Sequence, residues 1–347
     1  MIRDFQDGQR IIADLLVVDC KKGVTAAQKS YLNLTLQDRS GTIEGKKWDV
    51  YPEDEAIFEK GKVVSVTADV LRYREVLQLK VHRGETLSED QVDWTSFIPN
   101  APVELTALKA KLDAYVDAIA DPDVKTLTKG ILDHFGGKYL IWPAAVRNHH
   151  NYVSGLLYHS LTMADMAVKV ASVYPNINRD ILLGGALVHD MGKTIELSGP
   201  NATSFTLEGK LLGHISLGQA ECRAIATKLG YFAYDDLPEA EKTLEHPLYR
   251  KKEIAVVFEH MFLSHHGKQE FGSPVLPLTR ESFVLALIDD LDAKMNILDK
   301  AYADIAKGNY TARLANMDDR YFYYPIYSKE TVPVGTSLEE ELEDLKK

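Results

Sequence analysis

The sequence predicts two domains of different class: an N-terminal five-stranded β-barrel in residues 1–87 and an all-helical domain in residues 105–330. Three observations predict this division. Strand-like segments fill residues 10–84, a proline-containing stretch without a clean period follows them, and the remaining sequence repeats apolar residues every three to four positions. A length of 347 residues, 45% of them hydrophobic, suits about two domains of ordinary size.

The barrel is predicted from five segments separated by Lys-Gly, Asp-Arg-Ser-Gly and Glu-Lys-Gly turns. In the second segment, Leu32, Leu34 and Leu36 alternate with polar residues, which indicates one buried face and one solvent-facing face. Five short strands in so few residues are typical of a small closed or nearly closed barrel. The segments are RIIADLLVVDC, YLNLTLQD, GTIEGKKWDV, KVVSVTADVLRY and VLQLKVHRG, at residues 10–20, 31–38, 41–50, 62–73 and 76–84.

A linker at residues 88–104 is predicted from VDWTSFIPNAPVEL, which holds two prolines and no regular period. Everything after it is expected to be helical. The last residues, 331–347, are expected to form a charged, solvated tail. The segments with helical periodicity are residues 105–120, 160–174, 181–192, 218–232, 255–267 and 281–306.

The charge distribution excludes wholesale electrostatic wrapping of nucleic acid, because the net charge is -11. Residues 1–83 carry 14 basic and 13 acidic side chains, a balance of +1, so the other residues carry -12. Any contact with a polyanion is therefore expected at a local patch, in the N-terminal part of the chain.

The compartment is predicted from the apolar runs and the cysteines. No stretch approaches the roughly 20 apolar residues that cross a bilayer, so no membrane association is expected. Cys20 and Cys222 are the two cysteines, and their separation indicates free thiols rather than a disulfide framework. A cytoplasmic protein is the expectation.

A set of histidines and aspartates predicts a metal site. His159 in GLLYHSL, the pair His189-Asp190 in ALVHDMGK, and Asp289 in LALIDDLDAK lie on apolar helical segments. A single histidine there is more often an ordinary core residue. Imidazoles and carboxylates that are buried together would each need a partner, however, and one metal ion can serve them all. This donor set suits Mn, Fe, Co, Ni or Zn better than Ca.

Three further histidines extend the set to two ions. Asp190 is expected to bridge an ion held by His159, His189 and Asp289 and a second ion held by His214, His265 and His266. Two ions about 3.5–4 Å apart clamp a phosphodiester and activate water near neutral pH. The predicted chemistry is hydrolysis by metal-activated water, without a side-chain nucleophile.

Three further residues, Lys193, His149 and His150, are candidate contacts for the substrate phosphate. Lys193 follows Asp190 by three residues, so on a continuous helix it would share the face of Asp190. The alternative for Lys193 is a helix C-terminal lysine after Gly192. His149 and His150 are candidate substrate contacts, with surface or capping roles as the open alternative.

These residues resemble the H…HD…D signature of HD-domain phosphohydrolases. More narrowly, the whole chain resembles the YhaM-type 3'-to-5' exoribonucleases, which join an N-terminal OB-fold to an HD domain; the stretches YLNLTLQDRSGTIEGKKWD, GALVHDMGKTIEL and LSHHGKQEFGSP carry the likeness. The resemblance implies removal of 5'-mononucleotides from the 3' end of single-stranded RNA, and also of single-stranded DNA. It implies Mn as the usual metal, with Co, Fe or Zn as alternatives. Gly155 stands where relatives that cleave cyclic dinucleotides carry a further acidic ligand, so a third metal is not expected.

An OB-fold binds single strands by stacking bases on aromatic side chains beside a basic groove. Core packing or cross-strand pairing is the alternative for each aromatic, and is favoured for at least two of them. The candidates for nucleic-acid contact are Tyr31, Trp48, Tyr51 and Tyr73, with Lys46, Lys47, Arg72 and Arg74.

Two other functions remain open at this stage. One is an HD phosphohydrolase of small nucleotides, in which the barrel serves assembly or regulation. The other is a non-catalytic single-strand binding module, against which the intact ligand set argues. The resemblance and the open edges of a barrel sheet also favour self-association into a homo-oligomer.

Overall fold

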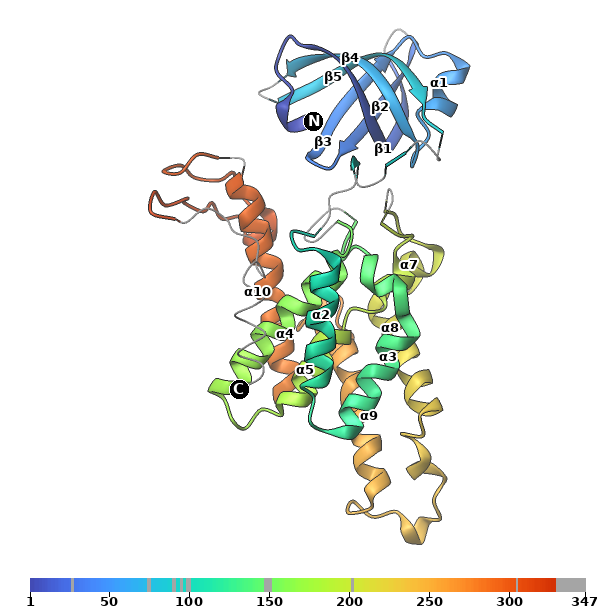
Figure 1. Cartoon of the computed structure of the whole chain (residues 1–347), viewed down its shortest axis with the longest axis vertical. Coiled ribbons are helices and arrows are strands. Elements are labelled where there is room, and N and C mark those ends of the chain that lie inside the picture. The colour runs from blue at the N-terminus through green and yellow to red at the C-terminus, as the bar shows by residue number, and fades with distance from the viewer. Residues whose placement is uncertain are drawn as a thin grey trace. The chain divides into compact units, whose positions relative to one another are not determined.

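The computed structural model divides the chain into two units, one of strands and one of helices (Figure 1). Each unit has its own hydrophobic core. The structure describes residues 1–25, 28–73, 76–88, 92–93, 96–97, 101–146, 152–200, 203–303 and 305–328. One unit holds residues 1–100 with 199–204, and the other holds residues 101–198 with 205–347. The first is built from β-strands and the second from helices, which confirms the predicted fold class.

The N-terminal unit is a closed five-stranded barrel with strand order β1-β2-β3-β5-β4. β3 pairs in parallel with β5, while the other neighbours are antiparallel. This OB-like topology has no free edge, because β1 pairs with both β2 and β4, so the expectation of open barrel edges that would favour self-association is wrong. The strands are β1 (Arg10–Val24), β2 (Ser30–Asp38), β3 (Gly41–Trp48), β4 (Val63–Tyr73) and β5 (Val76–Thr86).

The barrel interior contains the leucines that the alternating pattern of β2 predicts. Leu32, Leu34 and Leu36 are fully buried, together with Val66 and Leu79 of β4 and β5. The other face of β2 points outward because successive side chains of a strand alternate between its two faces. A short helix, α1 (Pro52–Ile57), follows β3 and begins with a proline, whose fixed φ suits the first helical turn.

α-Helices joined by loops form the described part of the second unit up to residue 303. Its helix α5 is buried along residues 181–188 and packs against α3, α4, α9 and α10. The helices are α2 (Leu105–Asp117), α3 (Pro122–Ile141), α4 (Gly155–Val173), α5 (Arg179–Val188), α6 (Lys193–Glu196), α7 (Leu207–Leu211), α8 (Gly213–Lys228), α9 (Pro247–Ser264) and α10 (Arg280–Ala303).

Two consecutive glycines in α5 allow its neighbours to approach closely. A Cβ atom on Gly184 would lie 2.8 Å from the ring of Phe258, and one on Gly185 would lie 2.2 Å from the Met261 side chain. Both contacts are with α9, so this sequence sets how near α9 lies to α5. That spacing matters because both helices lead directly into predicted metal ligands.

The structure corrects one sequence-based expectation about the helical unit. Residues 305–328 are not helical apart from one short 3₁₀ turn, and they pair in antiparallel bridges between Tyr310 and Tyr323 and between Leu314 and Arg320. The 20-residue helix α3 lies in the part of the chain that was expected to be helical, outside the six segments given for it. Within the part of the chain that the structure describes, no helix is long and apolar enough to span a bilayer.

Candidate metal centre

The predicted ligands come from the ends or middles of five helices of the second unit. His159 lies in the first half of α4, and Asp289 lies in the middle of α10. His189 and Asp190 follow the last residue of α5, while His214 is the second residue of α8. His265 and His266 follow the last residue of α9. Positions as far as 130 residues apart in sequence, from His159 to Asp289, thus meet in one place.

The first group gathers around the Nε2 atom of His159. This atom lies 3.3 Å from Nε2 of His189, 3.3 Å from Oδ1 of Asp289 and 3.6 Å from Oδ2 of Asp190. Oδ2 of Asp190 is also 3.6 Å from Nε2 of His189. Two imidazole nitrogens and two carboxylate oxygens therefore converge on a space that a single ion can fill.

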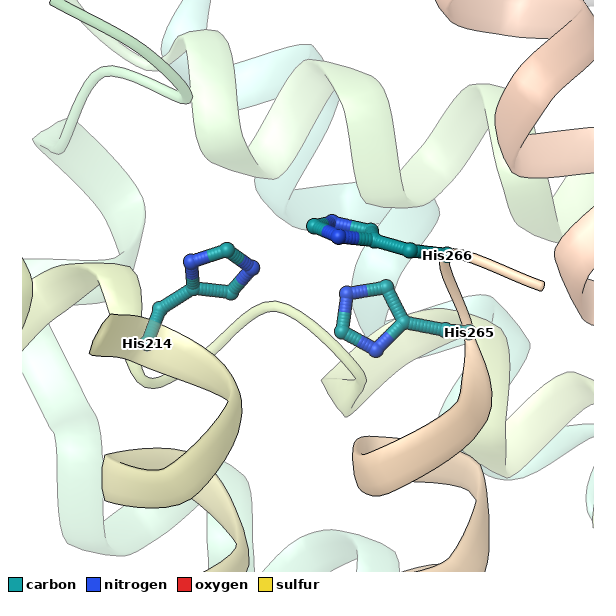
Figure 2. Close-up of side chains that lie close together, drawn as sticks. All are labelled: His214, His265 and His266. Carbon is teal, nitrogen blue, oxygen red and sulfur yellow. The ribbon is translucent and has the colours of Figure 1, made fainter. Parts of the chain in front are cut away.

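The second group contains His214, His265 and His266, whose rings face one another across the gap between α8 and the end of α9 (Figure 2). Nε2 of His214 and Nε2 of His265 each lie 3.4 Å from Oδ1 of Asp190. Asp190 thus directs one oxygen toward each group. This is the arrangement that a carboxylate bridging two ions requires.

Hydrogen bonds at Nδ1 fix which ring nitrogen of the histidines faces the centre. Nδ1–H of His189, His265 and His266 donates to the carbonyl oxygens of Ala186, Phe262 and Phe271, at 3.0, 2.8 and 2.8 Å. Because a carbonyl oxygen can only accept, the neutral ring carries its proton on Nδ1 and keeps a lone pair on Nε2.

The remaining two histidines use carboxylates for the same purpose. Nδ1 of His159 lies 2.7 Å from Oδ2 of Asp292, and Nδ1 of His214 lies 3.1 Å from Oε1 of Glu196. A carboxylate behind an imidazole holds the ring in place and increases its basicity as a ligand. Each of the two groups therefore has one such pair.

The donor chemistry of the centre fits a divalent cation. Within the described residues, Oδ1 of Asp190 and Nε2 of both His214 and His265 are buried and make no hydrogen bond. All three are electron-pair donors facing one another, and a polar atom left without a partner in a protein interior costs free energy. A metal ion bound between them would satisfy all three atoms at once.

The electrostatic field of the centre favours positive charge. Burial alone would lower the pKa of His159, but Asp289 and Asp292 offset this effect and raise it to about 10. Burial would likewise raise the pKa of Asp190, but the Lys193 ammonium holds it well below its usual value. By contrast, burial lowers the pKa of His189 to about 3, so that ring stays neutral.

Lys193 reaches the centre by a different backbone path from the predicted one. α5 ends at Val188, and tight turns follow, in which the Lys193 N–H donates to the Asp190 carbonyl at 2.9 Å. Lys193 then begins α6, so it lies neither on a continuing helix nor at a helix C-terminus. Its buried Nζ atom is 2.6 Å from Oδ2 of Asp190, and although burial lowers the pKa of this lysine, Asp190 raises it above its usual value.

The barrel candidates divide into outward and inward residues. Tyr31 and Trp48 are cross-strand neighbours on the outer face, with ring centroids 5.0 Å apart, and Lys46 Nζ lies within 6 Å of both rings. Tyr51, Arg72 and Tyr73 are also exposed. Lys47 is buried and lies 3.3 Å from Asp54, so it does not belong to this surface. Candidates outside the described residues are Arg74, His149 and His150.

Glu196 and Asp292 are the site residues that sequence reasoning missed. Glu196 lies in the HDMGKTIEL stretch, and Asp292 lies three residues after Asp289. Asp292 occurs one helical turn from a predicted ligand, which is a usable signal. Glu196 carries no such signal, because only the fold brings it to α8.

Comparison with known proteins agrees with this geometry. The family model described as HD domain matches residues 156–294, a range that runs from α4 into α10 and holds every ligand candidate above. The fold and the site thus define an HD-domain protein with an N-terminal OB-like barrel.

The chain is 38% identical over 325 residues to the 3'-5' exoribonuclease YhaM of Geobacillus sp. (strain WCH70), an alignment that covers 93% of this chain and 94% of that protein. This chain therefore belongs to the YhaM family. No solved structure matches it.

Proposed function

We propose that this chain is a metal-dependent 3'-to-5' exoribonuclease that removes 5'-mononucleotides from single-stranded RNA, and also from single-stranded DNA. The observation that carries the proposal is Asp190, whose two carboxylate oxygens each face a separate set of imidazole nitrogens. The 3'-to-5' direction and the RNA substrate rest on the similarity to the 38% identical 3'-5' exoribonuclease YhaM.

Two ions per site are proposed, with Mn as the expected metal and Co, Fe or Zn as alternatives. The first would be held by His159, His189, Asp190 and Asp289, and the second by Asp190, His214, His265 and His266. When bound, such ions lower the pKa of coordinated water and neutralise charge on phosphoryl oxygens.

The side chains of this chain orient and balance that centre. Asp190 is shared by both groups, and Asp292 and Glu196 hold the rings of His159 and His214. Lys193 provides a buried ammonium beside Asp190, which we assign to stabilising negative charge as the phosphodiester is cleaved. No side chain is required as a nucleophile.

The barrel is proposed to hold the single strand. Tyr31, Trp48 and Lys46 form one outward surface on β2 and β3, the strands that OB-folds commonly use for oligonucleotides. Stacking on these rings needs no particular base, which suits a nuclease that degrades many sequences. Arg72 and Tyr73 at the end of β4 are proposed as further contacts.

Self-association and a cytoplasmic location complete the proposal. The face of α10 formed by Phe283, Leu287, Leu291 and Met295 is exposed at four-residue spacing. The stripes of two copies of the chain can pack together about a twofold axis, so that Phe283 of one copy lies against Met295 of the other. Sedimentation of the full chain tests self-association, since a monomer at all concentrations would contradict it.

Cys20 and Cys222 are free thiols, as expected in a reducing compartment.

A time course on single-stranded RNA labelled at its 5' end tests the activity. With Mn, we expect a ladder that shortens from the 3' end, and with EDTA we expect none. Asp190→Ala should abolish the ladder because it removes an oxygen from both groups at once. Asp290→Ala is the matched control, since Asp290 is an exposed neighbour of Asp289 paired with Lys294.

The outcomes separate the candidate functions. Intact RNA in every lane would overturn the exoribonuclease and favour a small-nucleotide phosphohydrolase. Full activity of Asp190→Ala would contradict the bridging role. Fragments produced by internal cuts would contradict the removal of nucleotides from one end.

A further inference from the structure

A rigid turn follows the last two histidines of the centre. Gly267 and Gly272 both adopt positive φ, at 76° and 99°, where a side chain would be strained. Between them, the Lys268 carbonyl accepts from the N–H groups of Phe271 and Ser273, at 3.1 and 3.2 Å. Ser273 is buried. The turn is therefore fixed at both ends and closed by its own hydrogen bonds.

This turn is tied directly to a candidate ligand. The carbonyl oxygen of Phe271 accepts the hydrogen bond from Nδ1 of His266 at 2.8 Å. His266 is more exposed than His265, which is fully buried, so it lies on the outer side of the second group. The backbone of Phe271 is thus one hydrogen bond away from the accessible side of the metal centre.

The Phe271 side chain is not used by the protein core. It is 55% exposed, although the rest of the residue is held in an ordered turn. Lys268 Nζ lies 5.2 Å from the centroid of its ring and also 3.2 Å from Oε1 of Glu270. An exposed aromatic ring beside an ammonium is the combination with which proteins hold single-stranded nucleotides.

The phenyl ring of Phe271 limits the chemical groups of a ligand that this surface can contact. It has no polar atom, so it can neither coordinate a metal nor donate to a phosphate, and its contribution to a site must come from stacking or apolar contact. Among the parts of an RNA strand, only the base has a flat π-face. The phosphate contact would fall to Lys268.

We propose that Phe271 stacks on a nucleobase flanking the scissile linkage and that Lys268 faces the adjoining phosphate. This inference rests on the proposed nuclease function and adds a substrate-binding residue to it. Because stacking accepts any base, the contact would fix the position of the strand end without selecting sequence.

The test compares Phe271→Ala with wild type on a short RNA and on the same RNA made abasic at the terminal or the penultimate nucleotide. Phe271→Ala keeps the backbone carbonyl that holds His266. We expect its kcat/KM on normal RNA to fall about 5- to 150-fold, mainly through KM, as for the loss of one stacked base. On the abasic RNA that removes the stacked base, the two proteins should be equal.

Matched variants separate stacking from other effects. Phe271→Tyr should retain wild-type kcat/KM, whereas Phe271→Leu should lose most of the stacking while keeping apolar area. Leu276→Ala removes another exposed apolar side chain from the same loop and should change nothing. Lys268→Met should raise KM equally on normal and abasic RNA, because the phosphate is present in both.

The results also distinguish this inference from the proposed function. If wild type leaves all RNA intact, the nuclease proposal fails. If wild type degrades RNA, and Phe271→Ala has the same kcat/KM as wild type on every substrate and binds the same amount of Mn per chain, the stacking role is overturned. The same follows if the defect of Phe271→Ala persists on both abasic RNAs.

Discussion

Asp190 links the two halves of the candidate centre because its two oxygens point in different directions. Oδ2 faces His159, His189 and the Lys193 ammonium, while Oδ1 faces His214 and His265. No other residue among those described joins both groups in this way. Asp292 holds the His159 ring of the first group, whereas Glu196 holds the His214 ring of the second, so the two groups can be perturbed separately.

Asp292→Asn and Glu196→Gln are predicted to weaken one metal site each. Both changes keep an oxygen that accepts from a histidine Nδ1 but remove the negative charge behind the ring. We expect Asp292→Asn to weaken the site that contains His159 and Glu196→Gln the site that contains His214, each by about 10- to 100-fold in metal affinity. Calorimetric titration of the metal-stripped full chain with Mn measures both sites.

Asp290→Asn is the control, because Asp290 pairs with Lys294 on the exposed side of α10. Equal weakening of both sites by either variant would mean that the two groups do not bind separate ions. An unchanged titration for Glu196→Gln would show that the Glu196 to His214 contact does not position that ring.

The convergence of the candidate ligands could be predicted from sequence because metal chemistry restricts which residue types can serve. A lone histidine on an apolar helix is more often a core residue, but His159, the His189-Asp190 pair and Asp289 together form a set of donors that suits a metal ion. The carbonyl oxygens of Ala186, Phe262 and Phe271 could not be predicted, because any residue type provides one. Phe271 itself has an ordinary hydrophobic side chain, and only its exposure distinguishes it.

At the scale of elements, close packing holds the ligand-bearing segments in register. A Cβ atom on Gly192 would lie 2.0 Å from the carbonyl oxygen of His214, which is a backbone atom of α8. The turn after α5 and the first turn of α8 can therefore meet only where residue 192 has no side chain. This contact fixes His214 relative to Asp190.

Gly192→Ala is predicted to damage the second metal group more than the first. The added methyl group must push the start of α8 away, which moves His214 but leaves His159, His189 and Asp289 in place. We expect a loss of about 1–3 kcal/mol in the free energy of unfolding, as for other overpacked sites, and a selective loss of one Mn per chain. Thermal unfolding and metal analysis of the purified protein measure the two effects.

Gly137→Ala provides the control within α3. A Cβ atom there meets nothing within 4 Å, so the change should be neutral or stabilise the protein by up to about 1 kcal/mol. If Gly192→Ala keeps two bound ions and wild-type stability, the close approach to α8 does not determine the position of His214.

The elements differ in how clearly the sequence shows them. α3 buries Val124, Leu127, Ile131 and Phe135 at helical spacing, but Gly136 has non-helical φ and ψ, and glycines weaken the helix propensity of this segment. Residues 305–328 hold together partly through stacked aromatic rings, such as Tyr302 on Tyr324, which leave no periodic signal. The barrel strands were identified because alternation and turns agree in the same segments.

At the scale of the whole molecule, charge is distributed unequally between the N-terminal residues and the rest of the chain. The chain carries -11 overall, yet residues 1–83 are close to neutral at +1, from 14 basic and 13 acidic side chains. The outer face of β2 and β3 adds two neighbouring rings and Lys46. Strand binding by stacking, with few ionic contacts, is the mode that such a surface favours, and its affinity should depend weakly on salt.

Trp48→Ala is predicted to impair the degradation of long RNA and to spare short RNA. Trp48 is 41% exposed in the barrel unit. A strand whose 3' end occupies the metal centre can bind a second surface only if it is long enough, so a short RNA should not depend on Trp48. On a long strand, loss of one stacked base should raise KM about 5- to 150-fold with little change in kcat. Ile12→Ala, which truncates another exposed side chain of the barrel, is the control.

Combining Trp48→Ala with Phe271→Ala shows whether the two units hold one strand. Substitutions without shared contacts act additively in free energy, so on long RNA the two increases in KM should multiply, while on short RNA only Phe271→Ala should matter. Measuring kcat and KM for the four proteins on RNA of increasing length gives the answer. If Trp48→Ala impairs short and long RNA equally, the barrel does not act by holding the distant part of the strand. If it impairs neither, the β2 and β3 face is not the RNA-binding surface.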